Sequence, residues 1–205
     1  MNEFDIKAAG WDLNPMHIER AESVAKQIAE RIPLNTLMTA LEFGAGTGLN
    51  SFLLKDKLRE ITMLDSSPEM VKIIKGKIES VRAVNLKALC FDLETQDWNN
   101  GGFDLIMTQM VLHHVADIDK IVKKFYMMLN PGGYLAIADL YPEDGSFHGA
   151  GFKGHNGFDT EALSSLIRNH GFKNVRDERC FVINKKISES ETRQFDVFLM
   201  TAGRI

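Results

Sequence analysis

The stretch that decides the fold is "LEFGAGTG", Leu41 to Gly48. It places three glycines at alternate positions directly behind a short apolar run, and such a run is typical of a buried strand. Glycine carries a large entropy cost on folding, so a cluster of glycines indicates a tight turn or a close approach of the backbone to another group. The stretch therefore predicts a strand, a glycine loop (residues 44–48) that approaches a ligand, and a following helix.

Two ligand classes and one alternative without a ligand can be tested against this loop. A triphosphate loop ends in Gly-Lys-Ser/Thr, but the chain has Gly48-Leu49-Asn50, which excludes that class. A dinucleotide loop has glycine at its first, third and sixth positions, and the sixth position counted from Gly44 is Leu49, which weakens that class. A tight turn without any ligand remains possible, although three alternating glycines favour it less.

Outward from the loop, strand-like and helix-like patterns alternate. We expect strands at residues 39–43, 61–65, 86–92, 103–108 and 134–140, and helices at residues 17–32, from 68 onward, at 118–129 and at 159–171. "NPGG", residues 130–133, is expected to end a helix and turn the chain. Two last strands, near residues 175–184 and 194–201, have no helix between them and should form an antiparallel hairpin at one edge.

This alternation predicts a doubly wound α/β fold with a mostly parallel, seven-stranded sheet and helices on both faces. In such a sheet, ligands bind beyond the carboxyl ends of the strands, where the strand order reverses. Acidic residues stand at two of these ends. Asp65 follows Gly44 by 21 residues, a spacing that suits an acid bound to a ribose diol, and Asp92 ends the next strand. Glu42 lies inside the first strand, where a carboxylate requires a donor or a cation.

Composition narrows the class of protein. The 205 residues suit one domain, and the net charge of −4 gives no basic surplus for nucleic acid or an acidic membrane surface. No apolar run is long enough for a membrane span, and the first residues lack the order of a signal peptide. Cys90 and Cys180 fall in apolar stretches, so we expect buried free thiols and a cytoplasmic protein.

Five motifs occur in order: "LEFGAGTG", "LDSSPEM", "CFDLE", "FDLIMTQMVLHHV" and "LNPGGYLAIADL". Together they resemble the successive motifs of class I S-adenosylmethionine-dependent methyltransferases, from about Asp5 to Leu140. The opening "FDIKAAGWD" is similar to the small-molecule branch that includes the ubiquinone and menaquinone C-methyltransferases. The resemblance implies a Rossmann-like methyltransferase fold, S-adenosylmethionine as cofactor and a small-molecule acceptor. It also implies that Trp11 covers the cofactor.

The resemblance further assigns roles around the methionine part of the cofactor. Gly44, Gly46 and Gly48 would let the backbone pass close to it. Glu42 would position the glycine loop or receive the amino group of the cofactor. Gln109 would lie between the methionine part and the opening for the acceptor.

A second set of roles concerns the nucleoside part. Asp65 would hold the ribose hydroxyls, with Ser66 and Met70 near the adenine. Asp92 would accept a hydrogen bond from the adenine amino group, and Leu93 would pack on the ring. The implied organisation is one domain: an N-terminal helical cap (1–35), a cofactor-binding core (36–140), a substrate lid loop (141–158), and a closing helix and hairpin (159–205).

Histidines mark the side where an acceptor would enter. His113 and His114 follow the fourth strand and are candidate bases, although they can equally be residues that pack beside the cofactor. His148 and His155 lie in the lid loop, where we expect them to be solvated. The pair lacks a third and fourth ligand, so the sequence predicts no metal site. Apolar surface in the lid loop comes from Phe147, Phe152 and Phe158.

Two alternatives to a methyltransferase acting on a small molecule remain at this point. One is a non-catalytic or regulatory module that keeps the cofactor pocket. The other is a nicotinamide-dependent oxidoreductase, which Leu49 disfavours. The segment "TQMVL", residues 108–112, lacks the Asn/Asp-Pro-Pro-aromatic pattern of nucleobase amino methyltransferases and the acid of catechol-type magnesium sites.

Overall fold

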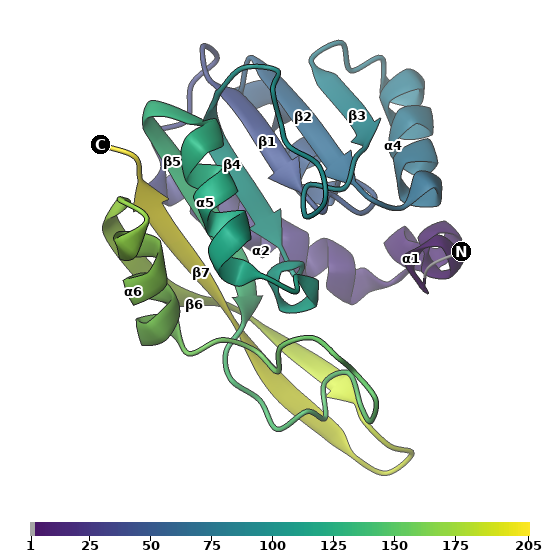
Figure 1. Ribbon diagram of the computed structural model, residues 1–205. Helices are drawn as coiled ribbons and strands as arrows, with labels where there is room; N and C mark the ends of the chain where they lie inside the picture. The colour runs from purple at the N-terminus through teal and green to yellow at the C-terminus, as the bar shows by residue number, and fades with distance from the viewer. Residues whose placement is uncertain (1–2) are drawn as a thin grey trace.

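The computed structural model describes residues 3–205, so the first two residues of the expected N-terminal cap lie outside it. One sheet has the strand order β3-β2-β1-β4-β5-β7-β6 (Figure 1). The strands are β1 (Thr39–Phe43), β2 (Glu60–Asp65), β3 (Leu86–Cys90), β4 (Phe103–Gln109), β5 (Leu129–Leu140), β6 (Lys173–Lys186) and β7 (Thr192–Gly203). Strands β1 to β5 pair in parallel, and β7 pairs antiparallel with both β5 and β6. The expected fold class and the hairpin at one edge are confirmed.

Helices cover both faces of this sheet. The helices are α1 (Glu3–Lys7), α2 (Pro15–Arg31), α3 (Leu49–Leu54), α4 (Pro68–Val81), α5 (Ile118–Met128) and α6 (Thr160–Asn169), with 3-10 turns η1 (Ala8–Leu13), η2 (Lys55–Lys57) and η3 (Leu112–His114). Side chains of α2, α3 and α4 join one apolar cluster, and those of α5 and α6 join another. Figure 1 shows α5 and α6 in front of the sheet and α2 behind it. Alternate residues of the central strands supply both clusters, as expected for strands buried on two faces.

Helix starts follow the expected capping chemistry. Ser67 precedes Pro68, and its hydroxyl accepts a hydrogen bond from Met70 N at 3.2 Å. At α6, the carboxylate of Asp159 accepts from Ala162 N at 2.8 Å. The strand order reverses between β1 and β4, so the loops after these strands diverge and open a crevice.

The "NPGG" segment differs from its expected structure. Helix α5 ends before it, as predicted, but residues 130–133 belong to β5, whose register shifts near its start. Gly132 adopts a φ of +83°, and its N–H donates to the carbonyl of Arg204 at 2.6 Å. The C-terminal residues thus pair with this segment, a long-range contact that the local turn pattern does not reveal.

The closing hairpin extends further than the sequence indicated, and the lid loop lies against it (Figure 1). Arg193 of β7 forms an ion pair with Asp144 at 2.5 Å, and Lys185 of β6 donates to the carbonyl of Phe147.

The two cysteines are free thiols, and Cys180 is buried as expected. The expectation for Cys90 is wrong: it is exposed, because β3 is the outer strand of the sheet and its end is not covered.

Candidate functional site

A pocket of about 780 Å³ opens at the carboxyl edge of the parallel strands. Its volume falls in the range of small-molecule sites, roughly 300–1,000 Å³. Nearly all residues singled out from the sequence line it: Trp11, Glu42, Gly44, Gly46, Asp65, Ser66, Met70, Asp92, Leu93, Gln109, His113 and His114. The tertiary structure therefore brings the separate motifs to one cavity.

The glycine loop needs glycine for two different reasons. Gly44 has a φ of +64°, and a Cβ added there would lie 2.4 Å from the Val111 side chain. Gly46 has a φ of +56°, and its N–H donates to Asp65 Oδ2 at 2.7 Å. Residues with positive φ are strongly biased to glycine. The loop is thus held open toward the pocket by its backbone conformation and by Asp65.

Gly48, the third glycine of the loop, is not among the residues that line this pocket. It has a φ of +80° and precedes α3. An added Cβ would lie 2.9 Å from the sulfur of Met63 and 3.3 Å from the Phe52 ring. Its role is to turn the chain and let α3 pack closely on β2.

Glu42 is 3 % exposed and lies at the floor of the pocket. Asn50 donates to its Oε1 at 3.2 Å, and Ser51 donates to Oε2 through both its backbone N–H and its hydroxyl. Burial outweighs these hydrogen bonds and raises the pKa of Glu42 to about 7. The same Asn50 amide donates to Gln109 at 3.3 Å, which links the ends of β1 and β4. The sequence expectation that Glu42 meets donors is confirmed.

Two further carboxylates are fixed by their own loops. Asp65 accepts from Ser67 N at 2.8 Å as well as from the glycine loop, and burial raises its pKa. Asp92 accepts from Glu94 N at 3.0 Å and from the Thr95 hydroxyl at 2.8 Å. Since backbone and short side chains hold both groups, their oxygens are positioned before any ligand arrives.

The N-terminal cap is tied to the glycine loop by a contact that sequence reasoning missed. Trp11 lies in η1 with its ring 4.3 Å from the His17 ring. The neighbouring Asp12 accepts from the Thr47 hydroxyl and pairs with Lys77 Nζ at 2.9 Å. The partners are far apart in the sequence, so no local pattern marks Asp12. The contact holds Trp11 over the pocket.

On the opposite side of the pocket, His113 of η3 is 1 % exposed. Its Nδ1 lies 2.6 Å from Oδ1 of Asp139, and its backbone N–H donates to Oδ2 of the same carboxylate at 3.2 Å. Asp139 itself is fully buried in β5. Asp139 is not among the residues singled out from the sequence, although one acid inside the apolar run "YLAIADL" was a usable signal.

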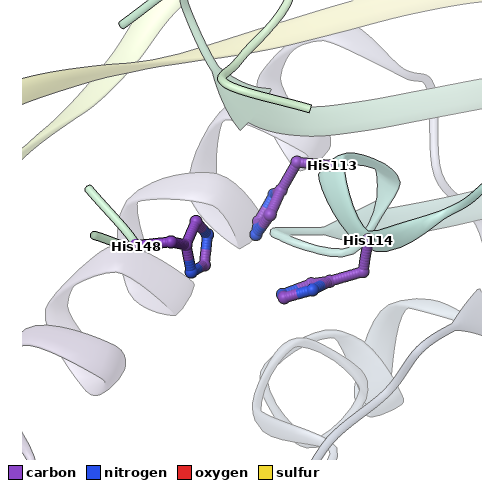
Figure 2. A group of neighbouring side chains, drawn as sticks. All are labelled: His113, His114 and His148. Carbon is purple, nitrogen blue, oxygen red and sulfur yellow. The ribbon is translucent and has the colours of Figure 1, made fainter. Parts of the chain in front are cut away.

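His114 and His148 lie beside His113. Ring centroids are 4.2 Å apart for His113 and His114, 4.9 Å for His113 and His148, and 5.2 Å for His114 and His148. Figure 2 shows the three rings turned toward a common space, with His113 and His114 on η3 and His148 on the lid loop. His148 stacks on Phe152 at 3.9 Å, so the expectation that it is solvated is wrong.

The lid loop packs tightly on η3. The N–H of His155 donates to the His113 carbonyl at 2.8 Å, and its ring Nε2 lies 3.0 Å from the Val115 carbonyl. A Cβ added at Gly154 would lie 2.1 Å from the His113 carbonyl oxygen. The expectation of a solvated His155 is therefore also wrong, because the lid loop is anchored to the turn that carries the other histidines.

A buried arginine, Arg20, lines the pocket together with the histidines of η3 and the lid loop. Arg20 of α2 is 5 % exposed, lines the pocket, and its Nε donates no hydrogen bond to any residue that the structure describes. Its terminal nitrogen lies 3.5 Å from the sulfur of Met16. Burial lowers the pKa of Arg20 to about 10, and Asp139 acts in the opposite direction. Lys185 and Lys186 of β6 also line the pocket, and β6 stands at the opposite edge of the sheet from β2 and β3, after which Asp65 and Asp92 lie. By strand order, the pocket is therefore acidic toward β3 and basic toward β6.

Comparison with known proteins assigns the family. Residues 41–137 match the model of a methyltransferase domain. Residues 41–137 therefore form a methyltransferase domain of the kind found in class I S-adenosylmethionine-dependent methyltransferases. It is 28 % identical over 154 residues to an uncharacterized methyltransferase of Schizosaccharomyces pombe, covering 67 % of this chain and 54 % of that protein. The chain thus spans about half the length of that relative.

Solved structures show the same methyltransferase fold. The methyltransferase solved with the Haloferax volcanii Trm112 activator has a TM-score of 0.79 at 19 % identity, covering 100 % of this chain and 98 % of that one. A Haemonchus contortus phosphoethanolamine N-methyltransferase, solved with phosphomonomethylethanolamine and S-adenosylhomocysteine, has a TM-score of 0.74 at 13 % identity, covering 100 % and 60 %.

The match to a methyltransferase domain agrees with S-adenosylmethionine, the cofactor that the sequence resemblance implies. The likeness to the ubiquinone and menaquinone branch and the cytoplasmic location stay predictions. Among residues 3–205, no helix has the length and apolar character needed to cross a membrane.

Proposed function

We propose that this methyltransferase moves the methyl group of S-adenosylmethionine to a small acceptor that carries an anionic group. The observation behind the proposal is the opposite charge at the two ends of one pocket. Glu42, Asp65 and Asp92 line one end, and Arg20 lines the other with Lys185. The cofactor bears an ammonium and a sulfonium against one carboxylate, so its net positive charge suits the acidic end and leaves the basic end to the acceptor.

At the acidic end, the proposed roles follow the fixed oxygens. Glu42 would receive the ammonium of the cofactor, and the backbone at Gly44 and Gly46 would pass beside the methionine part. Asp65 would accept from the ribose hydroxyls. The remaining proposed cofactor contacts are Trp11, Ser66, Met70, Asp92, Leu93 and Gln109, all of which line the pocket. Gly48 is left out of this set because it faces Met63.

At the basic end, Arg20 carries the argument for an anionic acceptor. A buried guanidinium is costly unless hydrogen bonds and an opposite charge compensate it. Asp139 supplies some compensating charge, but Arg20 Nε has no acceptor among the described residues. A carboxylate or phosphate of the acceptor would supply both an acceptor atom and a negative charge.

The chemistry needs little beyond positioning. The acceptor nucleophile forms a bond to the methyl carbon as the carbon–sulfur bond breaks, and the electron pair of that bond stays on S-adenosylhomocysteine. Holding the three atoms in line in a water-poor cavity supplies most of the rate enhancement. We propose that the lid loop, residues 141–158, closes the acceptor side, since Phe147 and His148 already line the pocket.

The test uses methyl-labelled cofactor and a panel of metabolite pairs in which a carboxylate or phosphate is replaced by its neutral amide or ester. Label is expected in an anionic member and not in its neutral counterpart. Arg20→Met should raise KM for that acceptor at least about tenfold, since a buried charge-assisted bond is lost. Arg176→Met, at an exposed position of β6 outside the pocket, is the matched control. Cofactor binding without transfer to any metabolite would instead support a non-catalytic module.

A further inference from the structure

We propose that His113, His114 and His148 form a binding site for a divalent transition-metal ion, with Zn²⁺ the best match, and with a further coordination position open to the pocket. Each histidine can offer one ring nitrogen, and these three atoms all lie within 4.8 Å of one another. The three rings face a common space between η3 and the lid loop (Figure 2). All three residues line the pocket, so an ion there would be reachable from it.

The spacing is close to that of a tetrahedral site. Zinc–nitrogen bonds of about 2.0–2.1 Å place neighbouring ligand nitrogens roughly 3.4 Å apart. Modest turns of the two half-buried rings, His114 and His148, would bring the nitrogens from their present separation to that value. His113 needs the least adjustment because it is buried and held.

Asp139 orients one histidine of the cluster by a hydrogen bond to its ring. Its carboxylate lies 2.6 Å from Nδ1 of His113, so that nitrogen carries the proton and Nε2 keeps its lone pair for a metal. Metal-binding histidines commonly donate their other nitrogen to a carboxylate in this way, which fixes the ring and raises its basicity. The full burial of Asp139 strengthens the effect.

Aromatic neighbours hold the other two rings. His148 stacks on Phe152 at 3.9 Å, and the His114 ring meets Phe4 edge-on at 5.1 Å and Phe152 at 5.3 Å. Packing against aromatic rings narrows the range of orientations of each imidazole but still allows a modest turn, so binding an ion costs little conformational entropy. The cluster is therefore organised by three separate parts of the chain: α1, η3 and the lid loop.

The donor set selects the metal. Three neutral imidazoles suit Zn²⁺ and related late first-row ions, whereas Mg²⁺ and Ca²⁺ require oxygen ligands. Three protein ligands with one open position are the arrangement of an accessible zinc site, whose fourth ligand is water or a heteroatom of a bound molecule. Metal binding here does not depend on methyl transfer, so it can be measured without cofactor or acceptor.

The test begins with full-length protein stripped by a chelator. Calorimetry with Zn²⁺ should show one ion per chain, and Co²⁺ should give the intense visible absorption of a tetrahedral complex. His148→Phe keeps an aromatic ring against Phe152 but removes the ligand, and it should weaken binding at least about 100-fold. Asp139→Asn should weaken binding by about 10–100-fold and leave the stoichiometry unchanged. His170→Phe, whose ring pairs with Asp119 outside the pocket, is the matched control and should bind normally.

Two results would overturn the proposal. One is the absence of saturable Zn²⁺ binding in a protein whose circular dichroism shows it to be folded. The other is binding that His148→Phe and His114→Phe leave unchanged, because the ion then occupies another site. Labelled methyl transfer is scored separately, so loss of metal binding and loss of the proposed function are distinguishable.

Discussion

The carboxylate of Asp139 and the imidazole of His113 form a pair in which both side chains are at most 2 % exposed and the two atoms lie 2.6 Å apart. The pair joins β5 to η3 and so fixes the wall of the pocket that His113 lines. Asp139 also accepts from the backbone N–H of His113 and of Leu140. One buried carboxylate therefore satisfies three donors inside an apolar core.

Replacing this carboxylate should destabilise the fold. Asp139→Ala leaves buried donors unsatisfied, and we expect a loss of about 2–4 kcal/mol in the free energy of unfolding. Asp139→Asn, which keeps an acceptor oxygen, should cost clearly less. Urea denaturation monitored by circular dichroism measures both values. Equal losses for the two variants would show that the negative charge of Asp139, and not its volume or a neutral acceptor oxygen, stabilises the fold.

The glycine loop should not tolerate a side chain at its first glycine. Gly44→Ala combines a positive φ with a Cβ that would lie 2.4 Å from Val111. We expect a loss of about 2–4 kcal/mol of stability together with loss of S-adenosylhomocysteine binding. Gly101→Ala has a φ of +91° but meets nothing within 4 Å, so it isolates the backbone strain. Thermal unfolding and calorimetry compare the two, and equal effects would exclude the steric clash with Val111.

Glu42 should make cofactor affinity depend on pH. Its pKa is raised from 4.5 to about 7, because burial outweighs its hydrogen bonds and nearby Asp65 adds like charge. A cofactor ammonium favours the ionised carboxylate, so binding should lower this pKa and release a proton. Affinity should then rise as the pH increases from about 6 to about 8, by up to about tenfold per unit below the pKa. Calorimetry in two buffers of different ionisation heat measures the released proton.

Glu42→Gln tests whether Glu42 causes the pH dependence of cofactor affinity. The raised pKa of Glu42 also fixes the direction in which the free energy of unfolding should change with pH. The Glu42 carboxyl group holds its proton more tightly in the folded state than in the unfolded state. The free energy of unfolding of the wild type therefore falls as the pH rises from 4.5 to about 7. The full effect amounts to roughly 3 kcal/mol and is reached above that interval. Relative to wild type, the Gln variant should be more stable at about pH 8 than at about pH 5, and its cofactor affinity should lose the pH dependence. An unchanged pH profile in this variant would rule out Glu42 as the group that titrates.

The link between the cap and the glycine loop should control cofactor retention. Asp12→Ala breaks the contacts to Thr47 and Lys77, so Trp11 would no longer be held over the pocket. We expect a several-fold faster release of S-adenosylhomocysteine, with stability changed by about 1 kcal/mol or less, since the ion pair is partly exposed. Stopped-flow fluorescence of Trp11 measures the release rate. Asp119→Ala, at a partly exposed ion pair with His170, is the control.

The parts of the site that the sequence revealed lie where a strand ends. Glu42, Asp65 and Gln109 stand within a residue of a strand terminus, and parallel strands bring such termini to one edge. An acid within or at the end of a short apolar run is a local signal, so Glu42 and Asp65 can be picked out from the order of residues alone, whereas Gln109 was implied only by the family resemblance. The alternating spacing of the three glycines does not distinguish Gly48 from the others, and only the packing of α3 shows that its α-carbon faces Met63 and Phe52.

The order of strands and helices and the acidic residues at the strand ends were thus determined by the sequence itself, because each depends on periodicity and on residues close together in the chain. The switch point and the basic side of the pocket, which we propose to bind the acceptor, were decided only by the tertiary structure. His148, Asp139 and Arg20 come from the lid loop, β5 and α2, which lie far apart in the sequence. Their meeting depends on how helices pack across the sheet and on how the lid loop docks on η3, and no local pattern encodes those contacts.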